Sequence, residues 1–417
     1  MRLLIISNMA HYLAGNRVVG WGPAVREINQ LAQVFDEVRH LAMLHPGTPP
    51  PTALPYISPK ISFLPLAPSG GRGVWAKAGI LRRSPQYLSA CLRELRRADA
   101  VHVRCPANVS LEALLLLRFL ERPKLRWVKY AGNWRPDERD PFFYRLQRRW
   151  LERGTHRGLV TINGEWPNQP SHVRSLHNPC FTDGELADAR ARTQEKQLGE
   201  PLRLLFAGRL RLSKGADRAL GILAGLRNRG LNARLDLAGD GPEARTLAQL
   251  AAQLGVENSV GFHGWLSRAA LENLYRRAHF LLLPSSTEGW PKVIAEAMAF
   301  RAVPLAAAVS CIPQIMDRTG AGIALPVEDI RGFVTQIERL ARDPAAWSRM
   351  AANGQRAAAA FTYEAYVERV RQMLRIEPAW QAEPQAAAAA HAFEGRGEAT
   401  RRPHTKVSER QAVKGAR

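Results

Sequence analysis

The feature that most constrains the fold is a regular alternation of short apolar runs with helix-length amphipathic segments. In the first half of the chain the apolar runs lie at 3–7, 38–44, 100–104, 126–131 and 159–163. A segment with Pro in its first turn, 23–35, has the spacing of an amphipathic helix. This alternation is typical of a parallel sheet covered by helices on both faces.

A second series of the same kind begins at RLLFAG, 203–208, and continues to about residue 376. The chain is also too long for a single hydrophobic core. We therefore predict an α/β fold of two tandem Rossmann-like, doubly wound parallel-sheet domains with a cleft between them. They would occupy residues 1–180 and 181–360, joined through the polar segment 182–200.

Two further segments complete the expected organisation. We expect a C-terminal helix at 361–377 that packs back towards the N-terminal domain. The basic, alanine-rich tail 378–417 contains a five-alanine run and scattered Pro and Gly, so we expect it to be disordered.

Composition narrows the class of protein. The apolar content of 46% is that of a globular chain. The apolar run at the N-terminus is too short for a signal peptide, and the run at 111–120 carries Glu112 and Arg118, so we expect no membrane-spanning segment. Four scattered cysteines without a CxxC pair favour a reduced, cytoplasmic protein without a zinc site.

The formal net charge of +22 is concentrated in residues 1–180. Basic surface suits nucleic acid, an anionic membrane or phosphorylated ligands. The stretch FFYRLQRRWLERGTHR, 142–157, has helical amphipathic character and could lie on an anionic membrane; a solvated basic helix with core-facing aromatics is the alternative. Neither interleaved aromatics on a basic sheet face nor a helix-turn-helix signal is present, so we expect no nucleic-acid partner.

Two strand-to-helix turns of the second series are candidate ligand sites, because ligands of open parallel sheets bind beyond the carboxyl ends of strands. In AGRLRLSKGAD, 207–217, the strand ends at Gly208 and the turn holds Arg209 and Lys214. Two cations beside a helix N-terminus can bind an anion. The turn in LAGDGPEARTL, 237–247, is neither a P-loop nor a GxGxxG motif, and by itself it indicates structure only.

The third turn is SSTEGWPKVIAEAMAF, 285–300, with Glu288 in the loop and Glu296 inside an apolar helix. A carboxylate placed among Ala, Ile and Met needs hydrogen-bond donors. The vicinal hydroxyls of a ribose or hexose would supply them; a structural ion pair with a basic residue is the alternative. The backbone N–H groups of Lys292 and Val293, in the first turn, could hold a phosphate.

Together the three turns suggest a nucleotide-sugar pocket, and they resemble a known family. AGRLRLSKGAD, LAGDGPE, GFHGWLSRAALENLYRRAHFLLLPSSTEGWPKVIAEAMAFRAVPLA and IPQI are similar to the retaining glycosyltransferases of the GT-B fold, family 4, the glycosyl transferases group 1 type. The resemblance covers 201–376 and is weaker in 1–180. Its most specific part is the Glu-x7-Glu element, Glu288 to Glu296.

The resemblance implies roles for individual residues. Arg209 and Lys214 would bind the donor diphosphate and stabilise the departing nucleoside diphosphate. Glu288 would contact the transferred sugar, Glu296 the ribose, and Trp265-Leu266 would lie near the base. The implied donor-binding set is Gly22, Gly208, Arg209, Lys214, Trp265, Leu266, Glu288, Gly289, Trp290, Lys292, Val293 and Glu296.

The N-terminal half departs from the family at two places that bear on the acceptor side. The family's first loop carries a glycine pair, but here Gly22 is followed by Pro23. The place of a family histidine near the reacting sugar is taken by Arg104, with His102 two residues earlier on the same face of the strand. The implied catalytic set is therefore Glu288, Arg209, Lys214 and Arg104.

The activity that the resemblance implies is transfer of a sugar from a nucleotide-sugar donor to a hydroxyl of a glycan or lipid-linked acceptor, with retention (a hexosyltransferase-like enzyme, EC 2.4). The expected pathway is cell-surface polysaccharide or lipopolysaccharide biosynthesis, in the cytoplasm or on the inner face of the plasma membrane. No Asp-x-Asp motif is present, so we expect neither a metal nor a cofactor. A nucleotide-sugar epimerase of GT-B fold and a catalytically silent binding or scaffold protein are the alternatives.

Overall fold

The computed structural model describes residues 1–69, 74–135 and 141–376. Met1–Leu374 form one compact unit. The predicted tail 378–417 lies outside the described residues.

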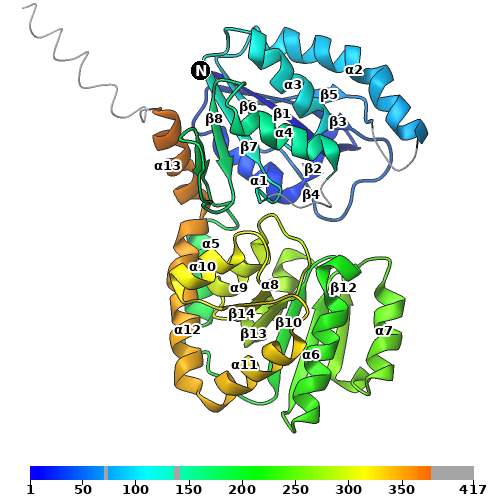
Figure 1. The fold of residues 1–417 in the computed structure, drawn as a ribbon, viewed down its shortest axis with the longest axis vertical. Helices are drawn as coiled ribbons and strands as arrows, with labels where there is room; N and C mark the ends of the chain where they lie inside the picture. The colour runs from blue at the N-terminus through cyan, green and yellow to red at the C-terminus, as the bar shows by residue number, and fades with distance from the viewer. Residues whose placement is uncertain (70–73, 136–140, 377–417) are drawn as a thin grey trace, which may run out of the picture. The chain divides into compact units, whose positions relative to one another are not determined.

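The first sheet belongs to the N-terminal half, and its described part contains nine strands (Figure 1). They are β1 (Arg2–Ala14), β2 (Arg17–Trp21), β3 (Glu37–Leu44), β4 (Ala53–Pro55), β5 (Ile61–Leu66), β6 (Ala100–Cys105), β7 (Leu125–Tyr130), β8 (Leu159–Ile162) and β9 (Val173–Ser175). The parallel order is β5-β3-β1-β6-β7-β8-β9. Its helices are α1 (Gly22–Leu31), α2 (Val74–Leu95), α3 (Asn108–Phe119) and α4 (Phe142–Glu152).

The second sheet is entirely parallel, in the order β12-β11-β10-β13-β14-β15. Its strands are β10 (Leu202–Ala207), β11 (Ala233–Ala238), β12 (Val260–Gly264), β13 (Phe280–Leu283), β14 (Val303–Ala307) and β15 (Ile323–Leu325). The strand order reverses between β10 and β13, the place where open sheets bind ligands. The predicted α/β class with two Rossmann-like parallel-sheet domains is confirmed.

The remaining helices begin after the first sheet. They are α5 (Asp183–Arg192), α6 (Ala216–Asn228), α7 (Ala244–Gln253), α8 (Arg268–Arg277), α9 (Lys292–Ala299), α10 (Ile312–Thr319), α11 (Ile330–Arg342), α12 (Pro344–Ala357) and α13 (Tyr363–Leu374), with short 3-10 turns at Leu212–Lys214, Glu257–Ser259 and Ala358–Phe361. No helix within the described ranges has the length and apolar character needed to cross a bilayer.

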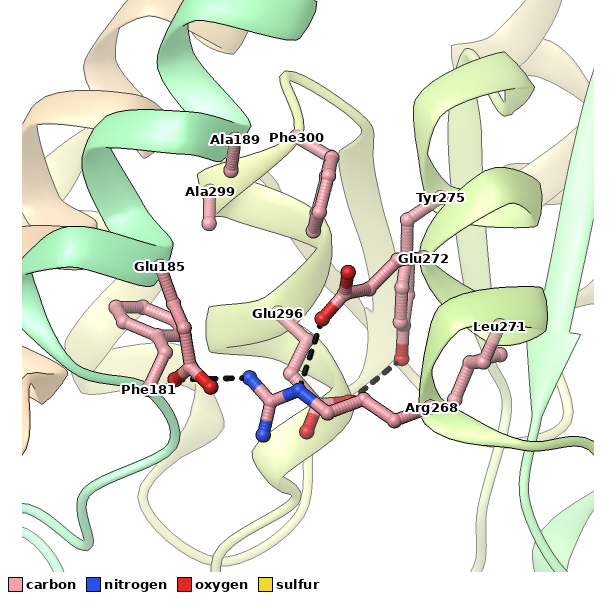
Figure 2. Close-up of a pocket in the computed structure, with 10 residues that line it drawn as sticks. All are labelled: Phe181, Glu185, Ala189, Arg268, Leu271, Glu272, Tyr275, Glu296, Ala299 and Phe300. Carbon is pink, nitrogen blue, oxygen red and sulfur yellow. Dashed lines mark hydrogen bonds and ion pairs between the residues drawn. The ribbon is translucent and has the colours of Figure 1, made fainter.

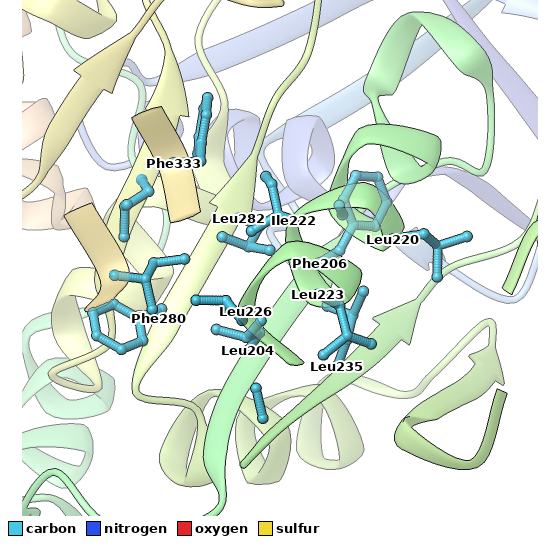
Figure 3. Close-up of a cluster of buried hydrophobic side chains, with 14 of the residues drawn as sticks. Leu204, Phe206, Leu220, Ile222, Leu223, Leu226, Leu235, Phe280, Leu282 and Phe333 are labelled. Atoms are coloured by element: carbon cyan, nitrogen blue, oxygen red, sulfur yellow. The ribbon is translucent and has the colours of Figure 1, made fainter. Parts of the chain in front are cut away.

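The four central strands of the second sheet, β11, β10, β13 and β14, are largely buried on both faces, which explains their apolar runs. Leu204 and Phe206 of β10 face one core, packed against α6, α7, α11 and α12 (Figure 3). The alternate residue Leu205 faces a second core, packed against α5, α8, α9 and α10. Because side chains alternate across a strand, one apolar run serves both cores.

The polar segment 182–200, which we expected to be a connection, contains α5. Thr182 accepts a hydrogen bond from the N–H of Glu185, and the Glu185 carboxylate accepts one from the N–H of Thr182. This reciprocal pair is a capping box, and T-x-x-E is its sequence signature. Leu186 and Ala189 are buried in the second core, so a short apolar stripe anchors an otherwise polar helix.

Helix α13, within the predicted segment 361–377, contacts α1. The Tyr366 hydroxyl donates a hydrogen bond to Glu27 Oε1 at 2.8 Å. The Arg26 guanidinium lies over the Tyr363 ring, 4.8 Å from its centroid. The end of the described chain is thus attached to the helix that follows β2.

Candidate active site

The first two predicted turns touch along their backbones. The N–H of Gly208 donates to the Ala238 carbonyl at 2.9 Å, and the N–H of Leu210 to the Asp240 carbonyl at 3.0 Å. A Cβ on Gly239 would lie 1.8 Å from the Gly208 oxygen, and one on Gly241 would lie 2.1 Å from the Leu210 oxygen. Any side chain at either glycine would separate the two turns.

The third turn is held against the first in the same way. The N–H of Ser286 donates to the Ser213 carbonyl at 2.9 Å, and the Ser285 hydroxyl donates to the Lys214 carbonyl at 3.1 Å. Gly215 has φ of +77°, and its Cβ would lie 2.1 Å from the Pro284 oxygen. The three turns at the carboxyl edge of the sheet therefore form one rigid backbone platform.

The platform brings Lys214 and Glu288 together, with the ammonium Nζ 2.7 Å from Glu288 Oε1. The Glu288 side chain is 8% exposed and that of Lys214 is 32% exposed. Partial burial reduces the screening of this pair by solvent, while the ammonium stays reachable from solvent. Arg209 is exposed, and within the described part of the chain no ion pair holds its guanidinium.

Glu296 lies on α9, and its partner is a tyrosine. The Tyr275 hydroxyl on α8 donates to Glu296 Oε2 at 2.9 Å. Burial raises the pKa of the Glu296 carboxyl, which the Tyr275 bond and the Lys292 charge partly offset. Among the described residues no cation forms an ion pair with this carboxylate, so the structural ion pair considered from the sequence does not form.

Glu296 also lines a pocket between α5, α8 and α9 (Figure 2). Across it, the Arg268 guanidinium contacts Glu185 Oε2 at 3.0 Å and Glu272 Oε1 at 2.8 Å. The lining residues are Phe181, Glu185, Ala189, Arg268, Leu271, Glu272, Tyr275, Glu296, Ala299 and Phe300. Glu296 thus faces a pocket that is lined by residues of its own domain.

The loop and first turn of α9 contact other parts of the chain. A Cβ on Gly289 would lie 2.3 Å from the Ala131 carbonyl, and the Trp290 ring stacks on Phe361 at 5.0 Å. The Lys292 ammonium donates to the Pro179 carbonyl at 2.7 Å, and Val293 packs against the second core. No side chain caps the N-terminus of α9, so its first N–H groups are not bonded by a capping group.

The predicted base-side pair follows β12. Gly264 has φ of +62° and its carbonyl accepts the N–H of Gly239 at 2.8 Å, which ties β12 to the same platform. Trp265 is 55% exposed, whereas Leu266 is half-buried against the second core. An exposed indole on a fixed turn can stack on a base.

In the N-terminal domain, Gly22 makes a close approach to the chain itself. Its N–H donates to the Thr52 carbonyl at 3.1 Å, and a Cβ there would lie 2.6 Å from the same oxygen. The glycine at this position is therefore explained by the contact of α1 with the β4 segment.

Arg104 is paired within its own domain. Its Nη1 lies 3.0 Å from Glu27 Oε1, and among the described residues it makes no ion pair with Glu288. His102 is buried and stacks on Trp127 at 3.7 Å, and burial holds its pKa well below the usual range. The side chain at the family histidine's place is thus a charged guanidinium, and the neighbouring imidazole is neutral.

Three side chains in the contacts around the candidate residues were not predicted from the sequence, namely Tyr275, Glu27 and Lys129. Lys129 interrupts the apolar strand RWVKYA, and Glu27 lies on the inner face of an amphipathic helix. Like Glu296, both are charges in apolar surroundings. Their need for a hydrogen-bond partner is therefore a signal that could have identified Glu27 and Lys129. Within the described ranges, no three His, Cys, Asp or Glu side chains gather as a metal ion would require.

Comparison with known proteins identifies the second domain. Residues 188–357 match the family described as glycosyl transferases group 1. These residues form a glycosyltransferase domain. The match covers the three turns, Glu288 and Glu296, and it places the chain among the glycosyltransferases, EC 2.4.

Individual relatives are distant. The alpha-D-kanosaminyltransferase of Streptomyces kanamyceticus is 24% identical over 303 residues, which are 67% of this chain and 77% of that protein. The sucrose-phosphate synthase of Thermosynechococcus elongatus superposes with a TM-score of 0.67 at 21% identity, over 93% of this chain and 99% of that one. Anabaena Alr3699/HepE in complex with UDP superposes with a TM-score of 0.64 at 15% identity, over 90% and 100%. These likenesses confirm the GT-B fold.

The backbone platform predicts that Gly241→Ala is destabilising. The new methyl group would overlap the Leu210 carbonyl, so the two turns must move apart, at a cost of about 1–3 kcal/mol. Gly199→Ala is the matched control, because nothing lies within 4 Å of its Cβ position. The measurement is the denaturant midpoint of both variants. Equal midpoints would show that the turns are not in close contact.

Burial of Glu296 predicts a pH-dependent gain for Glu296→Gln. Because the folded-state pKa of this carboxyl is raised, the wild type loses stability as pH rises from the ordinary carboxyl range, about 4.3, through that raised value. Glutamine can still accept from Tyr275 and does not ionise. The thermal midpoint of the variant should therefore rise relative to wild type from pH 4 to 7. Glu257→Gln, at an exposed site, corrects for the lost charge; an opposite trend would mean that the ionised carboxylate is stabilised.

Proposed function

We propose that the chain transfers a sugar from a nucleotide-sugar donor to an acceptor hydroxyl with retention of configuration, without a metal or cofactor. The observation that carries the proposal is the platform that holds the Lys214–Glu288 pair at 2.7 Å beside the uncapped N-terminus of α9. The likeness to Anabaena Alr3699/HepE, whose structure contains UDP, supports a nucleotide ligand.

Each group has a chemical task in this proposal. The bond between the anomeric carbon and the leaving diphosphate oxygen breaks, and negative charge develops on that diphosphate. Lys214, Arg209 and the N–H groups of Lys292 and Val293 stabilise that charge, the largest contribution expected in such a reaction. Glu288 keeps the ammonium of Lys214 in place and contacts the sugar.

Retention follows if the acceptor hydroxyl attacks from the face that the diphosphate leaves. The new bond joins the acceptor oxygen to the anomeric carbon, and the hydroxyl proton passes to the departing diphosphate oxygen. The second oxygen of Glu296, to which no hydrogen bond runs from the described residues, is available to a ribose hydroxyl. Trp265 would stack on the base.

Two variants should affect donor binding and turnover differently. Glu296→Ala should weaken donor binding, because a hydroxyl loses a charged acceptor worth about 1.5–3 kcal/mol. Lys214→Ala should mainly lower turnover, by about 3 kcal/mol in the barrier. The measurements are thermal shifts with UDP-, GDP- and ADP-sugars, then steady-state kinetics with the donor that stabilises the protein.

Arg245→Ala, an exposed arginine on α7, is the control for loss of a surface cation. Wild-type activity in both site variants would refute the pocket. Absence of stabilisation by every nucleotide sugar would refute the transferase proposal, and formation of an epimerised nucleotide sugar would favour the epimerase.

We further propose a glycan or lipid-linked acceptor of cell-surface polysaccharide or lipopolysaccharide biosynthesis, used in the cytoplasm at the inner face of the plasma membrane. Helix α4 supports this location. Phe142 and Phe143, at its first turn, are 64% and 55% exposed, and Arg145 and Arg149 beside them are also exposed. Aromatic rings with flanking cations are suited to an anionic lipid surface.

Membrane binding predicts that Phe142→Ser/Phe143→Ser weakens cosedimentation with phosphatidylglycerol vesicles by about tenfold or more, since two exposed rings that would enter the lipid are lost. Leu254→Ser, an exposed apolar residue on the second domain, is the matched control. Wild-type protein that stays in the supernatant at low salt would contradict the proposal.

A further inference from the structure

A buried lysine and a partly buried arginine at the carboxyl edge of the first sheet share a single carboxylate. Lys129 on β7 places its Nζ 2.7 Å from Glu27 Oε1, and Arg104 on β6 contacts both Glu27 oxygens at 3.0 and 3.4 Å. The exposed fractions of the side chains are 4% for Lys129, 3% for Glu27 and 15% for Arg104. The three groups therefore carry a net charge of +1 in a place with little water.

Within the described residues no second carboxylate pairs with Arg104 or Lys129, although the Lys129 ammonium also lies over the Tyr366 ring, 5.3 Å from its centroid. The remaining direct partner of Glu27 is the neutral hydroxyl of Tyr366. Lys292 acts electrostatically on both Glu27 and Lys129, and it adds a further positive charge. Burial and the charge of Arg104 hold the pKa of His102 well below its usual range, so that ring stays neutral.

Uncompensated buried charge is costly, and the cost is visible in Lys129. Burial lowers the pKa of its ammonium to about 8, although Glu27 acts in the opposite direction. Charged groups perturbed in this way cluster at functional sites, and an anionic ligand would supply the missing negative charge here. The guanidinium of Arg104 has five N–H groups, and Glu27 engages two of its nitrogens, so further donors remain for a ligand.

We infer that the acceptor of the proposed transfer carries an anionic group, a phosphate or a carboxylate, that binds at Arg104 and Lys129 and completes this charge cluster. The inference rests on the proposed function. Arg104 is the most exposed member of the three, so it would meet the anion directly. Lys129, which is paired to the same carboxylate, would contribute its positive charge from a more deeply buried position.

Three sugars that differ by one group test the inference. Glucose, glucose 6-phosphate and glucuronate are titrated into the wild type by calorimetry, with and without saturating UDP, and inorganic phosphate is titrated alone. The wild type should bind at least one anionic sugar about tenfold or more tightly than glucose, as a charge-assisted bond provides. Comparing the two anionic sugars distinguishes phosphate from carboxylate.

In Arg104→Gln the preference for the anionic sugar should fall towards one, and Arg104→Lys should restore part of it. Arg245→Gln, on the second domain, should keep the wild-type preference. The preference for the anionic sugar over glucose is also measured in Lys129→Gln as an independent test, and circular dichroism verifies that this variant folds. A purely structural arginine would lower the affinities for glucose and for the anionic sugar alike, and would leave their ratio unchanged.

Several results would overturn the inference. One is a wild type that binds glucose as tightly as both anionic sugars, or that binds neither anionic sugar nor phosphate. Another is an Arg104→Gln variant whose affinity for UDP falls as much as that for glucose 6-phosphate, since the cations would then serve the donor. Failure of the proposed function is a separate readout, the absence of any nucleotide effect in the same titrations.

Discussion

The candidate site of the second domain depends on backbone-to-backbone contact between three turns. Gly239 and Gly241 press against the first turn, and Gly215 presses against the third, at distances that exclude a Cβ. This contact fixes the backbone position of Lys214, and the ion pair between Lys214 and Glu288 depends on that position. The geometry of this candidate site therefore depends on the absence of side chains at three glycines as much as on the charged groups.

Three carboxylates in this chain are stabilised by three different means. Glu288 faces one partly exposed ammonium, Glu296 meets a tyrosine hydroxyl, and Glu27 is enclosed by two cations and a hydroxyl. Two of the pKa values move in opposite directions: the cations hold that of Glu27 well below its usual range, whereas burial raises that of Glu296. The type of donor therefore decides which carboxylate stays ionised and which remains sensitive to pH.

Most of the fold could be predicted from the sequence because its signals are local. Apolar runs flanked by glycine predicted the strands of the two parallel series. The residues at the strand-to-helix turns indicated Lys214, Glu288 and Glu296 as candidates. The missed elements depend on distant contacts or on weak signals. Strand β2 forms because β1 continues to Ala14 and pairs back on it, and α5 hides its apolar stripe in a polar segment. Tyr275 lies 21 residues before Glu296, so no spacing rule joins them.

The cluster around Glu27 connects helices α1 and α13 to strands β6 and β7 on the proposed acceptor side. Its carboxylate accepts from Tyr366 on α13 while it holds Arg104 and Lys129 on adjacent strands. The hydroxyl of Tyr366 cannot ionise near that carboxylate, because burial and the negative charge both raise its pKa. It therefore remains a fixed donor, and α13 serves as a third support for Glu27. A bound anion would offset the excess positive charge of Arg104 and Lys129. It would leave the hydrogen bond from α13 unchanged, since the tyrosine hydroxyl is neutral.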